Sequence, residues 1–226
     1  MILTRDDCSE SGRKELPMKK SVSLFLCILC CLFPLSACSQ PEKSIEDHVN
    51  LALEQFGKPL GEAFEGMKLP GSLEEAAKPQ YCLLVEDAVN VLGKQSNVAL
   101  LHLGRHEEGQ ELTEQKTESV AYSAFLDGDY AYPLKLYQAL LKAYGEPEPV
   151  TGAQSFGEAT EASLEAMKQS ERCVGRWEKE DYVIEISFYV GTSAAGERLD
   201  SISLDIRMPD ELLDLPTIAP DGEIIG

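Results

Sequence analysis

The amino-acid sequence predicts an α+β fold, an antiparallel β-sheet with helices packed on one face, within one domain over residues 44–208. Two observations support this class. Residues 182–190 and 202–208 alternate apolar with polar side chains, as strands with one buried face do. Residues 133–144 instead carry apolar side chains at helical spacing.

The predicted domain begins with a helix. Ser44 is a suitable N-cap, and Gly57 with Pro59 ends the helix. A second, brief helix is expected over residues 72–77. The apolar residues that fall at helical spacing in the first helix are Ile45, Val49, Ala52, Leu53 and Phe56.

Strands are expected after these helices. Residues 81–85 are nearly all apolar, which is typical of a strand covered on both faces. Residues 88–92 and 98–103 follow, and residues 93–97 between them indicate a hairpin loop. Residues 119–126 predict a further strand.

The strongest helix signal begins at Pro133, a residue tolerated in a first turn, and ends at Gly145 and Pro147. Its predicted apolar stripe consists of Leu134, Tyr137, Leu140, Leu141 and Tyr144. Residues 158–169, rich in alanine and glutamate, indicate another helix. Residues 172–178, which contain Trp177, are expected to form the strand that pairs with residues 182–190.

The two main helices end alike, in Phe56-Gly57-Lys58-Pro59 and in Tyr144-Gly145-Glu146-Pro147. An aromatic residue, a glycine able to adopt positive φ and a proline make a sound helix end on physical grounds alone. The similarity therefore has two interpretations, two related α/β halves or shared capping, and shared capping is favoured.

The first 37 residues have the character of an export signal. Lys19 and Lys20 precede an apolar run over residues 24–33, which is short of the roughly 20 residues of a membrane-spanning helix. Residues 1–17 carry mixed charges, unlike the basic start of a signal, so we expect translation to begin at Met18.

The stretch Leu35-Ser36-Ala37-Cys38 resembles the lipobox of bacterial lipoproteins. This resemblance implies cleavage between Ala37 and Cys38 and a diacylglyceryl group on Cys38, with residues 38–43 as lipidated cysteine and tether. The protein would be anchored on the outer side of the cytoplasmic membrane, or on the outer membrane facing the periplasm if the cell has two membranes. A plain secretory signal with an incidental cysteine is the alternative.

The net charge of the chain excludes some classes of binding partner. The chain has 20 basic and 39 acidic residues, a net charge of −19, and loss of residues 1–37 would change the net charge to −20. Such a chain repels nucleic acid and anionic headgroups, so nucleic acid is excluded as a partner. We expect membrane contact through lipidated Cys38, another envelope protein or a small ligand as partner, and no cofactor.

Two cysteines, Cys82 and Cys173, follow Cys38 in the chain. In an exported protein they could form a disulfide that stabilises the fold by about 2–4 kcal/mol. Free cysteine also packs well as a small apolar side chain. No spacing rule decides between the two interpretations.

No residue pattern predicts catalysis or a metal site. His102 and His106 are four residues apart, a spacing that suits a metal site only on a helix, whereas the local pattern is that of a strand. A polar strand end is therefore preferred to the alternative, a weak surface metal site completed by Glu107 and Glu108. Residues 127–129, Asp-Gly-Asp, lack the further ligands of a calcium loop and indicate a turn.

Four tyrosines are concentrated around the second main helix. They could line a ligand groove, although such residues more often form the core between a helix and a sheet. The four are Tyr130, Tyr132, Tyr137 and Tyr144.

The second main helix with its Tyr144-Gly145-Glu146-Pro147 end, the strand that contains Trp177 and the two alternating strands resemble small α+β domains of envelope lipoproteins related to the SmpA and BLIP-like group. The resemblance covers residues 119–208 and implies a non-catalytic binding or assembly module. Such a module predicts an exposed apolar or aromatic patch on an acidic surface. A ligand-sensing lipoprotein, and a hydrolase or metal-dependent enzyme without a recognisable motif, are the alternatives.

Residues 209–226 contain three prolines and form the C-terminal tail. A frayed terminus is the default expectation for such a segment. A partner-binding extension and a return along the sheet are the alternatives.

Replacement of Cys38 tests the predicted anchor. We expect wild-type protein extracted from membranes to begin at Cys38 and to carry added acyl mass, because two or more acyl chains hold a protein durably in a bilayer. Intact mass spectrometry of the wild type beside Cys38→Ala checks this. Mature wild type without lipid would contradict it.

Overall fold

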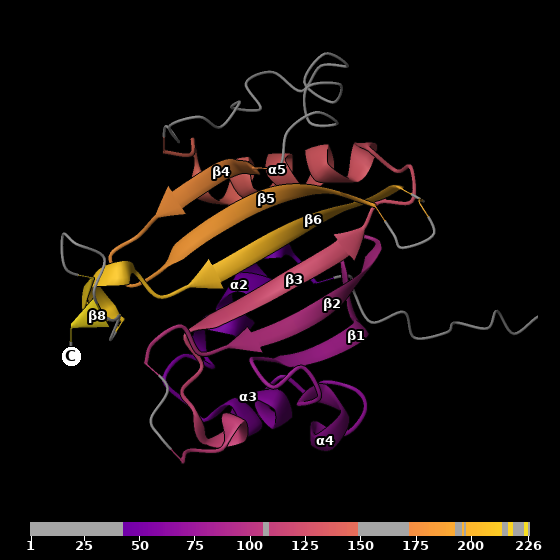
Figure 1. Ribbon diagram of the computed structural model, residues 1–226. Helices are drawn as coiled ribbons and strands as arrows, with labels where there is room; N and C mark the ends of the chain where they lie inside the picture. The colour runs from indigo at the N-terminus through magenta and orange to yellow at the C-terminus, as the bar shows by residue number, and fades with distance from the viewer. Residues whose placement is uncertain are drawn as a thin grey trace, which may run out of the picture. The chain divides into compact units, whose positions relative to one another are not determined.

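Six antiparallel strands form one open sheet in the computed structural model. The strands are β1 (Leu83–Val91), β2 (Lys94–Leu101), β3 (Ser119–Phe125), β4 (Arg172–Glu178), β5 (Val183–Thr192) and β6 (Arg198–Arg207). Their order in the sheet is β1-β2-β3-β6-β5-β4, so the centre is the pair of β3 and β6 (Figure 1). The predicted α+β class is confirmed.

The structure describes residues 43–105, 109–148, 172–192, 196, 198–213, 217–218 and 224–225. They all belong to the unit Glu42–Gly226, whereas the unit Met1–Pro41 lies outside the described residues. The predicted signal, residues 1–37, and the helix expected over residues 158–169 both lie outside the described residues. Among the described residues, no helix is long and apolar enough to cross a membrane.

Two helices, α2 (Ile45–Leu53) and α5 (Ala131–Tyr144), lie on one face of the sheet (Figure 1). Two shorter helices, α3 (Leu60–Gly66) and α4 (Leu73–Ala76), lie near the edge formed by β1 and β2. A 3-10 turn, η1 (Leu112–Glu114), precedes β3 and contacts α3.

The start of α2 follows the prediction. Ser44 forms a capping box with Asp47: the Asp47 amide donates to Ser44 Oγ at 3.2 Å, and the Ser44 amide donates to Asp47 Oδ2 at 2.9 Å. The regular helix ends at Leu53, and Gly57 adopts a φ of 76°. The capped helix presents Ile45 and Val49 to the core.

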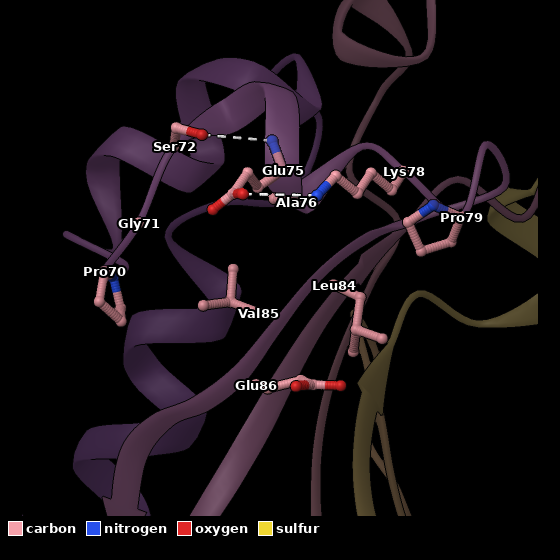
Figure 2. Close-up of a pocket in the computed structure, with 10 residues that line it drawn as sticks. All are labelled: Pro70, Gly71, Ser72, Glu75, Ala76, Lys78, Pro79, Leu84, Val85 and Glu86. Carbon is pink, nitrogen blue, oxygen red and sulfur yellow. Dashed lines mark hydrogen bonds and ion pairs between the residues drawn. The ribbon is translucent and has the colours of Figure 1, made fainter.

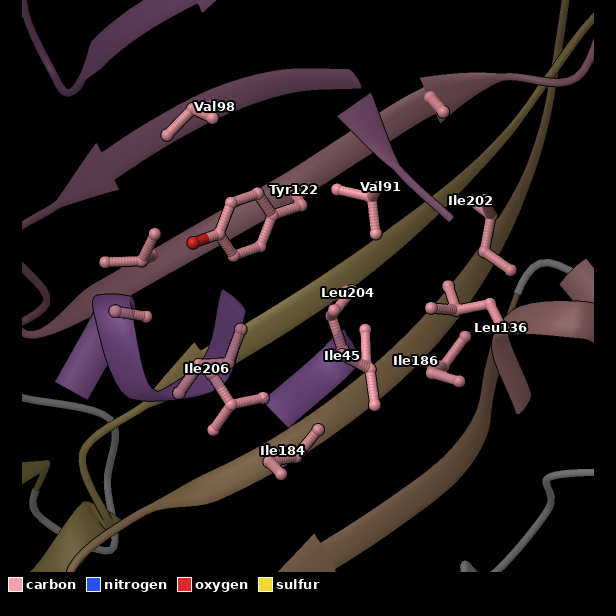
Figure 3. Close-up of a cluster of buried hydrophobic side chains, with 14 of the residues drawn as sticks. Ile45, Val91, Val98, Tyr122, Leu136, Ile184, Ile186, Ile202, Leu204 and Ile206 are labelled. Atoms are coloured by element: carbon pink, nitrogen blue, oxygen red, sulfur yellow. The ribbon is translucent and has the colours of Figure 1, made fainter. Parts of the chain in front are cut away.

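The core lies between the sheet and the helices, as Figure 3 shows for its central part. Trp177 of β4 is almost completely buried, and its Nε1 donates to the Gly145 carbonyl at 2.7 Å, so it joins the end of α5 to the sheet. Each such large apolar side chain contributes about 1.5–3 kcal/mol on burial. The alternating strands supply Ile184, Ile186, Phe188, Ile202, Leu204 and Ile206.

The first strand differs from the prediction. Residues 81–85 were expected to be covered on both faces, but burial alternates from Leu83 through Leu84 to Val85, and Tyr81, 67% exposed, precedes the strand. The reason is that only one face of β1 packs against the core, as is common in antiparallel sheets.

The predicted hairpin exists, but its loop is shorter than expected. Leu92 and Gly93 both adopt positive φ, 49° and 87°, and form a two-residue turn. Residues 94–97, expected in the loop, belong to β2. The two strands expected before the loop, over residues 81–85 and 88–92, form a single strand, β1, with a bulge. The bulge lies between Val85, which pairs with Val98, and Val89, which pairs with Ser96.

Helix α5 buries a stripe that only partly matches the predicted one. Tyr137 and Leu140 are buried as expected, whereas Leu134, Leu141 and Tyr144 are only half-buried. The helix has apolar residues over a wide arc, so its rotation against the sheet decides which are covered. The other buried residues are Tyr132, Pro133 and Leu136.

The order of elements repeats along the chain. Helix α2 precedes the meander β1-β2-β3, with α3 and α4 between them, and α5 precedes the meander β4-β5-β6. Gly57 and Gly145, after the two main helices, both adopt positive φ. This repetition favours two related halves over shared capping as the origin of the similar helix ends.

The tail has more structure than the frayed terminus expected. A 3-10 turn, η2 (Asp210–Leu212), follows the buried Pro209. Further on, β7 (Thr217–Ile218) and β8 (Ile224–Ile225) pair as a small antiparallel ladder separate from the main sheet.

Candidate binding face

One face of the main sheet carries no helix within the described part of the chain. Figure 1 views this side, with α2 and α5 behind the strands. We call it the open face: it holds the side chains of β2 to β6 that alternate with the core residues. The strand register divides these side chains into rows that run across the sheet.

The first row of the open face exposes aromatic side chains. Phe125 lies opposite Ser201, and Ser201 lies opposite Tyr189. Phe125 is 49% exposed and Tyr189 is 50% exposed. Leu199, 39% exposed, lies two residues before Ser201 on the same side of β6. Ordinary surfaces rarely align several large apolar side chains in this way, so this row is a candidate contact surface.

The next row consists of serines. Ser123, Ser203 and Ser187 lie opposite one another on β3, β6 and β5. Their short side chains lie between the taller side chains of the rows on either side, so they form the floor of the open face.

The third row carries charge. Asp205 lies directly opposite Glu185, and Glu185 lies directly opposite Arg176. Arg176 Nη2 lies 2.7 Å from Glu178 Oε1, while its Nη1 lies 3.8 Å from Glu185 Oε2. Two carboxylates that face each other on neighbouring strands destabilise a sheet, so this row lowers the stability of the fold.

The environment of Asp205 changes its acidity. The pKa of this carboxyl is raised to about 6: burial is the main cause and the charge of Glu185 adds to it, whereas a hydrogen bond from Ser203 and the charge of Arg207 partly offset the rise. Arg207 itself pairs with Asp210 at 2.5 Å. Carboxyl groups with perturbed acidity are often found at functional sites.

A cavity of about 200 Å³ adjoins the aromatic row. Its lining includes Phe125 together with Gln95 and Asn97, which lie on the open face of β2. Asp87 at the bulge of β1 and Asp127 after β3 add negative charge, and Lys94 pairs with Asp127 at 3.6 Å. The open face therefore combines apolar contact area with acidic side chains.

A second cavity, of about 450 Å³, lies between α4 and β1 (Figure 2). Its charged lining residues are Glu75, Lys78 and Glu86. The side chains of Glu75 and Lys78 pair at 3.4 Å and are both largely exposed to solvent. Exposed, paired groups are not the desolvated acid and base that an enzyme would need here.

The sequence-predicted lipidation and cleavage residues, Cys38 and Ala37, lie outside the described residues. The disulfide interpretation is contradicted, because Cys82 is a buried, free thiol. Cys82 precedes edge strand β1, whereas Cys173 belongs to β4 at the opposite edge. A disulfide needs Cα atoms within about 7 Å, which six strands do not allow.

His102 forms a buried pair with Glu118 rather than an open ligand site. His102 Nδ1 lies 3.0 Å from Glu118 Oε2, and its Nε2 lies 3.0 Å from the Arg105 carbonyl. Glu118 Oε2 also accepts from the amides of Leu103 at 2.7 Å and Gly104 at 2.8 Å. His106, Glu107 and Glu108 lie outside the described residues.

The remaining candidates have structural roles. Asp127 and Gly128 adopt positive φ, and the Asp129 amide donates to the Leu126 carbonyl at 2.8 Å, which confirms the predicted turn. Tyr132 and Tyr137 are buried in the core, and Tyr130 and Tyr144 pack against it. None of them lines either cavity described above.

The residues of the open face were not recognised as a site from the sequence. Period-two alternation places Phe125 and Tyr189 on the polar sides of their strands. These two aromatic residues at polar positions are the sequence feature that could have indicated a binding face. Their alignment through Ser201 depends on the pairing of β3 with β6, which sequence patterns do not contain.

Comparison of the chain with protein-family models, curated proteins and solved structures found no match.

Replacement of Glu118 tests the buried pair. We expect Glu118→Ala to lower the free energy of unfolding by about 2–4 kcal/mol, because two backbone amides and His102 lose their acceptor. Thermal unfolding measures the effect, with the exposed Glu114→Ala as the matched control. Equal melting temperatures for the two variants would show that Glu118 does not organise this loop.

Replacement of Asp205 tests the charged row. The pKa of Asp205 is higher in the folded than in the unfolded chain, so wild type loses stability as pH rises from about 4 through about 6. We expect Asp205→Asn to be more stable than wild type by about 1–3 kcal/mol above pH 7, with the difference vanishing near pH 4. Denaturant unfolding at several pH values measures it. The exposed Asp181→Asn should change little, and a pH-independent effect of Asp205→Asn would contradict the argument.

Proposed function

We propose that this chain is a lipid-anchored envelope protein that acts as a non-catalytic binding or assembly module, and that it binds another envelope protein through the open face. The observation that carries the proposal is the row of Phe125, Ser201 and Tyr189, which exposes apolar area where no described helix covers the sheet. Aromatic side chains of this kind supply much of the energy of protein interfaces.

The proposed anchor would keep the start of α2 within reach of a membrane. Ser44, which caps α2, follows Cys38 by six residues, and an extended chain of that length spans at most roughly 20 Å. The partner would thus be an envelope protein on the same membrane or one that reaches its surface. A relation to the SmpA and BLIP-like group remains part of this proposal.

The alternatives have less support. A ligand-sensing lipoprotein would need an apolar cavity lined by the tyrosines, but these residues belong to the core or its margin. A hydrolase or metal-dependent enzyme would need converging, desolvated titratable groups. Glu75 and Lys78, in the larger cavity, are exposed and paired with each other.

Site-specific photo-crosslinking in cells tests the proposal. A photoreactive amino acid at Ser123, on the floor of the open face, should form one discrete adduct, identified by mass spectrometry and confirmed by crosslinking from the partner. The same amino acid at the exposed Glu65 of α3 is the control and should form none. We expect Phe125→Ala with Tyr189→Ala to reduce the Ser123 adduct at least tenfold. Equal adducts from Ser123 and Glu65, or none from either, would overturn the proposal.

A further inference from the structure

The charges on the open face are unevenly matched. Its two arginines already have partners, since Arg176 pairs with Glu178 and Glu185, and Arg207 pairs with Asp210. No lysine or arginine of the described chain forms an ion pair with Asp205. The contact between Arg176 and Glu185 is long at 3.8 Å, so Glu185 also has capacity for a second cation.

We infer that the partner contributes a polypeptide segment that sets a Lys or Arg side chain against Asp205 and Glu185 and an apolar side chain against Phe125 and Tyr189. This inference rests on the proposed function and specifies the chemistry of the partner. A cation between the two carboxylates would relieve the repulsion that the isolated sheet retains.

The spacing of the rows supports a polypeptide. Phe125 and Ala121, and likewise Tyr189 and Glu185, are four residues apart on their strands, or about 13 Å. An extended segment spans this distance with side chains at positions i and i+4, and its backbone would cross the row of short serine side chains between the two rows. Neither a metal ion nor a simple amine spans both rows and also supplies apolar contact.

The charge of the whole chain supports the same choice. A net charge of −19 attracts a basic segment and repels an acidic one, which steers association toward partners of positive charge. Anionic lipid headgroups are disfavoured by the same charge.

Synthetic peptides test the inference with the full chain in detergent. The basic peptide carries Trp and Arg four residues apart in a serine and threonine background. Its two relatives carry Glu or Gln in place of Arg. Fluorescence anisotropy should show at least tenfold tighter binding of the basic peptide than of the Glu peptide, with a preference that weakens as salt is added.

Two double variants locate the effect. Asp205→Asn with Glu185→Gln should abolish the preference for the basic peptide, whereas Asp181→Asn with Glu180→Gln, at the exposed turn before β5, should retain it. Because the first pair removes charge without removing volume, the circular dichroism spectrum should stay unchanged.

The outcomes separate this inference from the proposed function. If all three peptides bind equally, and Phe125→Ala with Tyr189→Ala abolishes that binding, the inferred Lys or Arg of the partner is overturned but the proposed binding face is not. A preference for the Glu peptide would have the same meaning. Failure of every peptide to bind, while Ser123 still crosslinks to a partner in cells, would overturn the inference alone. Failure of both experiments would overturn both.

Discussion

The antiparallel pairing of β3 with β6 is the interaction on which the rest of the structure depends. Seven residue pairs, from Ser119 opposite Arg207 to Phe125 opposite Ser201, join two three-stranded meanders into one sheet. One side of this pair contributes Tyr122 and Leu204 to the core beneath α2 and α5. The other side aligns the rows of the open face, so the same register determines both the core and the candidate binding surface.

The residues of the open face make the fold less stable than a sheet with a purely structural role would be. Asp205 and Glu185 face each other on the neighbouring strands β6 and β5, and Phe125 and Tyr189 expose about half of their surface. Uncharged polar residues at these positions would remove the repulsion and the exposed apolar area. Unfavourable features that coincide on one face are typical of a surface shaped for binding, where stability and function conflict.

Local patterns predicted most of the fold, since the Ser44 cap, β4 and the period-two strands β5 and β6 are determined by neighbouring residues. The tight turn at Leu92-Gly93 was missed because leucine rarely adopts positive φ. The one-sided burial of β1 depends on which face of the sheet packs against the core, and the alignment of Phe125 with Tyr189 depends on strand order. Strand order arises from packing between distant segments, so sequence patterns could not reveal the binding face.

Accessibility of the open face in intact cells tests the central claim most directly. Ser123→Cys protein is treated with a membrane-impermeant maleimide, in cells and after purification, and modification at residue 123 is measured by peptide mass spectrometry, with Glu65→Cys on α3 as the reference. A partner on the open face predicts at least tenfold slower modification of Ser123→Cys in cells than in the purified protein, with equal rates for Glu65→Cys. Equal rates for Ser123→Cys in both states would contradict the account.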